Sequence, residues 1–377
     1  MIYKRLICAL LFILIISVPS FTVYAYNVDE YTENGLKASG ADELSAYLSE
    51  ETKEYLRKLG CADIDFEALL DVSAESVFEL MGEMLKNGLK EPLKAFLKSA
   101  GIVLLVSVCS GFFPDDEKSR IILNLICGSV TVIGVLVPAV NVIRAAVSTI
   151  GLCVTFEKAL IPVLAGVLTA GGNPALALTF KGAAFAAAEF VEYFAGNFSM
   201  PIIGISGALG ITGAMLPTLR LSAVSDVIRK TVTTSLGCVS GLFSGFLALK
   251  SVLSSSADAL IIRGVRTAAS FIPVVGGSLG EAYNSVSASI SLLKGTVGIY
   301  AIVALILMVV PVAINLALWV FAMRFACTVS EVLDCGVCSE ILKNIAFIFS
   351  LTNSILLLCT AVFVISSGLV VAVKAGE

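Results

Sequence analysis

Eight polar side chains that interrupt apolar stretches are the residues of this sequence best suited to chemistry. They are Glu157, Lys158, Lys181, Glu189, Glu192, Glu281, Asn284 and Lys294. Charged groups inside a membrane are costly, so each one in an apolar run is a candidate for function. On a helix, Glu189 and Glu192 share one face, because they lie three residues apart. Lys158 or Lys181 could neutralise one of these carboxylates. Glu157 and Lys158 are adjacent in the sequence, so they point to different faces. The pattern predicts a polar stripe that lines a conduit or joins subunits, and the alternative is that these charges snorkel to the membrane surface.

The last three of these residues lie in the stretch Phe271–Tyr300, which is apolar but unusually rich in glycine and serine. Pro273 and the pair Gly276–Gly277 would interrupt a helix begun at Phe271, because proline lacks the amide donor and glycine adds backbone freedom. Lys294 and Gly295 then close the segment before a strongly apolar run. Interrupted backbone at membrane depth is tolerated only where protein or water covers it. We therefore predict a re-entrant or pore-lining hairpin here, with an ordinary span as the alternative.

Several kinds of active site are disfavoured by the residues present. The 377-residue chain has no histidine, which removes histidine-based triads, metal sites and proton relays. It has no Walker loop, no GxSxG motif and no paired-carboxylate hydrolase arrangement. Cys335-Gly-Val-Cys338 is its one CxxC motif, and without a second pair it predicts no zinc site, although an external loop would allow a reversible disulfide. We expect no catalytic residue, no metal, no cofactor and no nucleic-acid partner.

The composition is typical of a membrane protein. Hydrophobic residues make up 58% of the chain and charged residues only 14%, whereas soluble domains carry about 25% charged residues. Six of the cysteines lie in apolar runs, where a thiol acts most simply as a small hydrophobe. They are Cys8, Cys109, Cys127, Cys153, Cys238 and Cys359. A disulfide framework is therefore not expected.

The N-terminal 98 residues divide into two parts. Residues 1–25 have the pattern of a secretory signal peptide, with Lys4-Arg5, an apolar core, and a small-x-small site at Val23-Tyr24-Ala25. An uncleaved anchor helix is the alternative. Residues 26–98 carry 16 acidic and 8 basic side chains, and apolar residues recur at helical spacing on both sides of a turn at Gly60. They predict a small, acidic, helical segment outside the cytoplasm.

Residues 99–377 are predicted to form a multi-span membrane domain. Nine apolar runs follow one another: Ser99–Phe113, Ile121–Ile143, Val147–Ala170, Ala175–Phe194, Met200–Leu219, Val232–Leu249, Phe271–Leu293, Thr296–Met323 and Ile345–Val373. Basic residues concentrate in cytoplasmic loops, which places Lys118, Arg120 and Arg229 inside. This rule is satisfied if Val232–Leu249 and Phe271–Leu293 are re-entrant and the other seven runs cross. The predicted fold is all-α: a polytopic helical membrane protein with a signal peptide, a small extracytoplasmic helical segment and about seven spans.

An internal repeat is predicted between residues 150–250 and residues 262–370. The sequence Ile161-Pro-Val-Leu-Ala-Gly-Val-Leu, followed by Asn173, aligns with Ile272-Pro-Val-Val-Gly-Gly-Ser-Leu, followed by Asn284. Transporters often bind their substrate at the interface of such repeats, between interrupted helices. The repeat therefore keeps a stand-alone secondary transporter open as an alternative to a channel scaffold that arose by duplication.

The sequence of the predicted hairpin also carries a family resemblance. The sequences IPVVGGSLGEAYNSV (272–286) and LLKGTVGIY (292–300), with the apolar span around Pro311, resemble stage III sporulation protein AE of endospore-forming bacteria. The order of signal peptide, acidic segment and several spans is similar too. The resemblance implies a multi-pass subunit of the secretion-like channel complex that links mother cell and forespore after engulfment, in the mother-cell membrane around the forespore. It implies the other membrane subunits and the lipid bilayer as partners, and no catalytic residues.

Overall fold

The computed structural model describes residues 39–61, 64, 68–69, 71–112, 117–171, 173–216, 221, 223–239, 241 and 276–372. Within these ranges all regular elements are helical. They are η1 (Ala41–Tyr47), α3 (Glu50–Lys58), α5 (Ala74–Ser110), α6 (Glu117–Ala170), α7 (Pro174–Glu192), the π-helix η2 (Tyr193–Ser199), α8 (Met200–Met215), α10 (Gly276–Val332) and α11 (Gly336–Ala372). Residues 223–239 are also helical. The predicted all-α fold is confirmed, and the predicted signal peptide lies outside the described residues.

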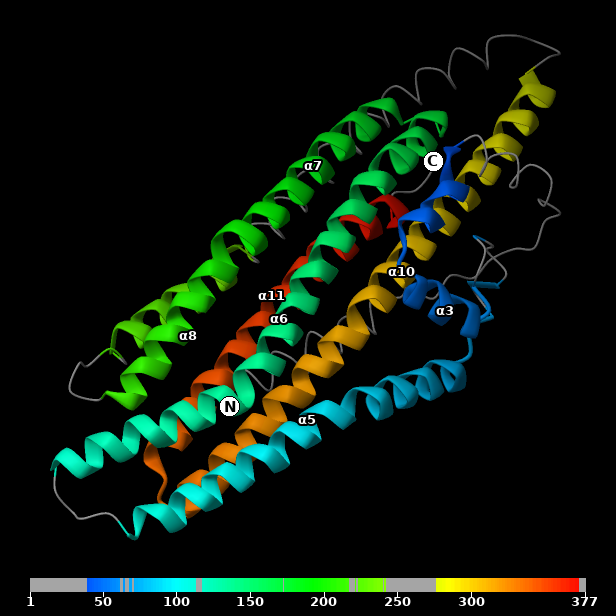
Figure 1. The fold of residues 1–377 in the computed structure, drawn as a ribbon. Coiled ribbons are helices and arrows are strands. Elements are labelled where there is room, and N and C mark those ends of the chain that lie inside the picture. Colours follow the sequence, from blue (N-terminus) through cyan, green and yellow to red (C-terminus); the bar gives the residue numbers. More distant parts are fainter. Residues whose placement is uncertain are drawn as a thin grey trace.

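The long helices run side by side in an elongated bundle (Figure 1). α10 and α11 form an antiparallel hairpin, and α5, α6 and α8 pack against it. At its centre the Trp319 ring lies 5.4 Å from the Phe349 ring, and both side chains are almost completely buried. This apolar hairpin is the core of the bundle, because other helices cover it from several sides.

The acidic segment forms short helices that are closed by their own caps. The Ser49 hydroxyl accepts a hydrogen bond from the Thr52 amide at the start of α3. At its end, Gly60 adopts a φ of +77°, and the Cys61 amide bonds back to Leu56 O at 2.9 Å. The turn predicted at Gly60 is therefore confirmed. Lys58 of α3 lies 2.7 Å from Glu83 of α5, and this hydrogen bond raises the pKa of the Lys58 ammonium.

α5 joins the acidic segment to the membrane domain without a break. Its N-cap is Ser73, and its buried positions recur every three or four residues, so they form one stripe along the helix. The members of this stripe are Leu80, Met84, Pro92, Ala95, Ser99 and Val103. A Cβ added to Gly88 would lie 3.3 Å from Leu318 Cδ1, which places α5 against α10. The predicted boundary at residue 98 therefore falls inside a helix that extends the short run from Ser99.

Two pairs of predicted spans are single helices. The runs Ile121–Ile143 and Val147–Ala170 both lie on α6, which changes direction along its length, as expected for a helix that contains Pro138 (Figure 1). The runs from Ala175 and from Met200 lie on one helical stretch, Pro174–Met215, made of α7, η2 and α8. The few polar residues between the runs end neither helix, because a polar residue removes no backbone hydrogen bond.

α10 differs from the hairpin predicted at Phe271–Tyr300. The helix begins at Gly276, after the proline, and then continues through Lys294 and Gly295 to Val332. The predicted break at Lys294–Gly295 is wrong, because a single glycine costs a helix only about 1 kcal/mol and this one is flanked by residues buried in the bundle. The residues from Phe271 to Val275, and the second predicted re-entrant run beyond Gly241, lie outside the described residues.

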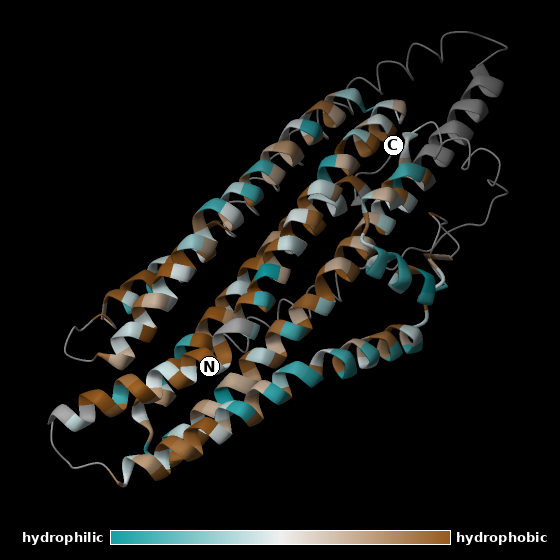
Figure 2. Cartoon of the chain, in the orientation of Figure 1, coloured by the Kyte–Doolittle hydropathy of each residue, from teal (hydrophilic) through white to brown (hydrophobic). Residues whose placement is uncertain are grey.

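Five of the described helical stretches are long and apolar enough to cross a membrane. They are Ala74–Ser110, Pro138–Ala170, Pro174–Met215, Leu293–Val332 and Gly336–Gly368. Figure 2 shows hydrophobic residues predominating along these stretches, whereas α3 and the first part of α5 are hydrophilic. α10, with 57 residues, is about 85 Å long, whereas the hydrocarbon core of a bilayer is about 30 Å thick. The number of crossings in the whole chain stays a prediction.

The turn between α10 and α11 lies at the end of the bundle opposite α3. The Ser107 hydroxyl, near the end of α5, donates to Leu333 O at 3.2 Å, and Cys335 Sγ contacts Val103 O at 3.7 Å. α10 starts at the other end of the bundle and passes α3 on its way to this turn (Figure 1). α5 therefore extends from the neighbourhood of α3 to the turn between α10 and α11, and the sides of the membrane on which the acidic segment and the Cys335–Cys338 pair lie stay predictions.

The predicted repeat can be compared at the aligned pair Asn173 and Asn284. Asn173 lies in the turn between α6 and α7, where its backbone carbonyl accepts from the Ala177 amide. Its aligned counterpart Asn284 lies within the helical backbone of α10. The two aligned segments therefore have different local structures at this point, and residues 262–275 of the second copy lie outside the described residues.

Candidate functional site

Lys158 forms two ion pairs that connect α6 to α7. Its Nζ lies 2.7 Å from Glu189 Oε1 and 2.8 Å from Glu192 Oε2. The two carboxylates lie on one face of α7, as their three-residue spacing predicted, and the turn after Ala170 folds α7 back along α6. Lys158 therefore pairs with two carboxylates rather than one, which leaves one net negative charge. We call Lys158, Glu189 and Glu192 the charged trio.

The charged trio lies on the outer surface of two candidate membrane spans. The side chains of Lys158, Glu189 and Glu192 are 32%, 68% and 56% exposed, and they belong to the stretches Pro138–Ala170 and Pro174–Met215. Charged groups within spans face protein or water rather than lipid. This face of α6 and α7 is therefore unsuited to contact with hydrocarbon.

Glu157 points the opposite way, into the bundle. Its side chain is buried, with 1% exposure, and it faces Ser366 and Ser367 of α11. The two hydroxyls lie beside the carboxylate without completing hydrogen bonds of good geometry, so both carboxylate oxygens lack a partner among the described residues. Adjacent residues of one helix thus serve two environments: Lys158 is at the surface and Glu157 is in the core.

The helix changes type directly after the charged trio. Tyr193–Ser199 is a π-helix between α7 and α8. Such segments are rare, and they are frequent at functional sites because they turn side chains out of the α-helical register. Here the Phe194 ring stacks on Phe190 at 5.6 Å and on Phe198 at 5.7 Å, while Tyr193 is exposed. The sequence signalled no such segment, since its residues fit an ordinary span.

The remaining predicted residues do not join the charged trio. Lys181 is exposed on α7, and among the described residues it forms no ion pair. Lys294 is buried on α10. Glu281 and Asn284 lie on the helical backbone of α10, but their side chains are outside the described part. The roles of Lys181, Lys294, Glu281 and Asn284 stay predictions.

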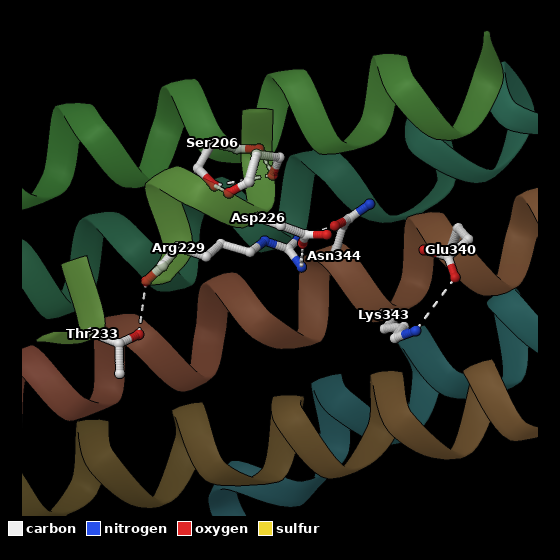
Figure 3. A network of polar contacts seen from close by, with 8 residues as sticks. Ser206, Asp226, Arg229, Thr233, Glu340, Lys343 and Asn344 are labelled. Atoms are coloured by element: carbon white, nitrogen blue, oxygen red, sulfur yellow. Dashed lines mark hydrogen bonds and ion pairs between the residues drawn. The ribbon is translucent and has the colours of Figure 1, made fainter. Parts of the chain in front are cut away.

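A second polar network, which the sequence did not predict as a site, surrounds Arg229 (Figure 3). The Arg229 guanidinium donates to Asn344 Oδ1 of α11, lies 3.7 Å from Asp226 Oδ1, and covers the Phe347 ring at 4.4 Å from its centroid. Its side chain is only 15% exposed. The sequence predicts that Arg229 is one of several cytoplasmic loop cations, whereas in the structure it anchors residues 223–239 on α11.

The same network connects residues 223–239 to α8. The Ser225 hydroxyl donates to Ser206 O at 2.9 Å, and the two hydroxyls lie 3.2 Å apart. A Cβ added to Gly210 would come within 2.7 Å of Asn344 Oδ1, so α8 approaches α11 closely at this glycine. Gly207 likewise faces Ile348, so both glycines of α8 allow close helix packing against α11.

The Cys335–Cys338 pair is buried at the start of α11. Both thiols are free, and Cys338 Sγ lies 3.3 Å from Thr131 Oγ1 of α6. Among the described residues, no group of three or more acidic, cysteine or histidine side chains could hold a metal ion. The pair therefore packs the start of α11 against α5 and α6, and the side of the membrane on which it lies stays a prediction.

Thiol labelling should reflect this burial. We expect a maleimide to modify Cys109 and Cys238 of the folded protein in mild detergent, because both are exposed, and to modify Cys335 and Cys338 only after unfolding. Mass spectrometry of the labelled peptides measures this. Rapid modification of Cys338 in folded protein would contradict the packing described for the turn.

Comparison with known proteins places the chain in a family. The model of a family described as stage III sporulation protein AE matches residues 70–374. The chain is 25% identical over 217 residues to stage III sporulation protein AE of Bacillus subtilis (strain 168). That match covers 56% of this chain and 54% of the relative, so it spans about half the length of each. No solved structure matches the chain. Since the family match extends over most of the sequence, this protein belongs to the stage III sporulation protein AE family.

Proposed function

We propose that this chain is a multi-pass subunit of the channel complex that joins mother cell and forespore, and that spores need it after engulfment. Membership of the family supports a role in sporulation, and the five apolar helical stretches support a membrane protein. The mother-cell membrane around the forespore is its proposed location. The proposal depends most on one observation, the exposed charged trio on two candidate spans.

The charged trio favours a subunit over a protein that acts alone. A charge at the bilayer centre costs roughly 2.5–3.5 kcal/mol on insertion scales, and the two ion pairs of the charged trio still leave one net negative charge on this face. A neighbouring subunit with polar groups, or a water-filled path between subunits, removes most of this cost. Either arrangement requires that other protein surrounds this face of α6 and α7.

We further propose that the chain works by assembly rather than catalysis, with other membrane subunits and the bilayer as its partners. A stand-alone transporter would need a substrate path inside this chain. The charged trio, however, lies on the outer surface of the bundle. A transporter should move its substrate when reconstituted alone, whereas a channel subunit should not.

Neutralising the charged trio tests the proposal. The variant Lys158→Met, Glu189→Gln, Glu192→Gln should reach the membrane at the normal level, because it removes charges that oppose insertion. Its association with other membrane subunits should fall about tenfold or more, the factor that corresponds to 1.4 kcal/mol of binding free energy. Spore yield should fall after engulfment in cells that carry only this variant. Quantitative copurification and spore counts measure the two effects.

A matched ion pair serves as the control. Lys343 and Glu340 lie 3.4 Å apart with side chains 60% and 56% exposed, at the start of α11. The variant Glu340→Gln, Lys343→Met should copurify and sporulate normally. Normal copurification and spore yield from the triple variant as well would contradict the proposal, because the trio would then need no partner.

A further inference from the structure

Glu157 is the deepest acidic side chain among those the structure describes, and it has no cation beside it. The adjacent Lys158 cannot serve, because its ammonium is held at the surface by Glu189 and Glu192. No lysine or arginine in the described ranges forms an ion pair with Glu157. Within the described part of the chain, the carboxyl group therefore lies inside the bundle without a compensating positive charge.

The groups that face Glu157 are hydroxyls and thiols. Ser366 and Ser367 of α11 lie beside the carboxyl group, and Ser367 Oγ has no hydrogen-bond partner of its own. Cys153, one turn earlier on α6, is the nearest titratable neighbour, and it lies next to Cys359 of α11. No titratable group of α7 or α10 among the described residues interacts with the carboxyl group.

An ionised carboxylate fits these surroundings poorly. Burying an unpaired charge costs several kcal/mol, and two hydroxyl donors compensate only part of that. A protonated carboxyl fits better, because it is both a donor and an acceptor. Its O–H can bond to Ser367 Oγ while Ser366 donates to the other oxygen. One added proton therefore provides partners for all three buried oxygens that lack them.

A metal cation fits less well than a proton. The carboxyl group and the two serine hydroxyls supply four oxygens, whereas calcium takes about 6 to 8 and magnesium requires near-ideal octahedral geometry. Phe156 and Leu160, close to Glu157 on α6, are apolar and fully buried. Four oxygens are enough to bind a proton, but they are too few to coordinate calcium or magnesium.

We propose that Glu157, with Ser366 and Ser367, is a proton-binding site that holds α6 against α11. The protonated carboxyl joins the two helices through hydrogen bonds, and losing the proton leaves an unpaired negative charge between them. Deprotonation therefore favours separation of α6 and α11. Because α11 is the neighbour of α10 in the central hairpin, the site links proton occupancy to the packing of the bundle core.

The pH dependence of unfolding tests this site in the purified protein. The single tryptophan, Trp319, is buried and reports unfolding by its fluorescence. Above about pH 5 an unfolded glutamate loses its proton, whereas folded Glu157 keeps it. Relative to Glu157→Gln, which cannot ionise, the wild-type unfolding constant should therefore rise about tenfold per pH unit from about pH 5 towards neutrality. All other titrating groups are shared and cancel in this ratio.

Two further variants keep the test decisive. Glu189→Gln removes an exposed, ion-paired carboxylate, and its unfolding constant relative to wild type should stay constant above pH 5. The wild-type unfolding constant relative to that of Glu157→Leu should rise with pH as steeply as it does relative to that of Glu157→Gln. A defect specific to the carboxamide then does not obscure the result. A ratio that is independent of pH for both Glu157 variants would overturn the proposal, since it would mean that folded Glu157 is ionised and compensated.

Discussion

Arg229→Met is expected to lower the free energy of unfolding by about 3 kcal/mol. The change removes a charged hydrogen bond to Asn344, which is worth about 1.5–3 kcal/mol, and a cation–π contact with Phe347 worth about 1–2 kcal/mol. It also leaves Asn344 Oδ1 buried without its donor. Residues 223–239 should then dock less firmly on α11. Trp319 fluorescence during denaturation in detergent measures the loss.

Neighbouring and paired variants separate the role of Arg229 from a general effect of charge. Lys230→Met removes an exposed cation one residue away and should change the stability by less than about 0.5 kcal/mol. Arg229→Met combined with Asn344→Leu should be less damaging than Arg229→Met alone, because no buried acceptor is then left unpaired. Equal losses from Arg229→Met and Lys230→Met would show that the network contributes nothing specific.

Gly210→Leu should be the most damaging change on α8, with a loss of at least about 3 kcal/mol. A single Cβ at this position would lie 2.7 Å from Asn344 Oδ1 and 2.9 Å from its Cγ, and inserting extra atoms into a packed interface typically costs about 1–3 kcal/mol. Asn344 cannot rotate away freely, because Arg229 holds it. The substitution therefore also disrupts the Arg229 network. Thermal unfolding followed by Trp319 fluorescence measures the loss.

Gly204 is the control on the same helix. It is exposed, and a Cβ there meets no atom within 4 Å. Gly204→Leu should therefore be neutral or stabilise the helix by a few tenths of a kcal/mol, because leucine has the higher helix propensity. If Gly204→Leu and Gly210→Leu lower the unfolding temperature equally, the close approach of α8 to α11 is not what makes Gly210 sensitive.

The helical class of the fold could be predicted from the sequence, but the helix boundaries could not. Apolar runs report which residues avoid water, and these runs did identify the helices. They do not report whether the backbone continues through a short polar interval. Gly295 in α10 and the interval before Met200 were predicted as boundaries, yet the helix runs through both. Neighbouring helices stabilise these positions, and that stabilisation depends on packing that a single sequence does not show.

The candidate site was predicted in part. Glu189 and Glu192 share a face because of their spacing, and Lys158 was one of two cations expected to pair with them, so local periodicity was sufficient for the charged trio. Arg229 was not predicted as a site, because its partners Asn344 and Phe347 lie more than a hundred residues away in the sequence. In the sequence, Arg229 is a single arginine in an apparent loop. The concentration of basic residues in cytoplasmic loops explains such an arginine without any binding partner.

The length of α10 affects how the orientation of one end of this helix is transmitted to the other end. An α-helix turns by about 100° with each residue, so the facing direction of one end is fixed by the number of residues that separate it from the other. α10 is one continuous helix from Gly276 to Val332, although a bilayer needs only about 20 of its residues. The segment that extends beyond the apolar core is thus rotationally locked to the hairpin around Trp319. A partner bound to that segment would be held at a set angle, and twisting it would apply torque to the core of the bundle.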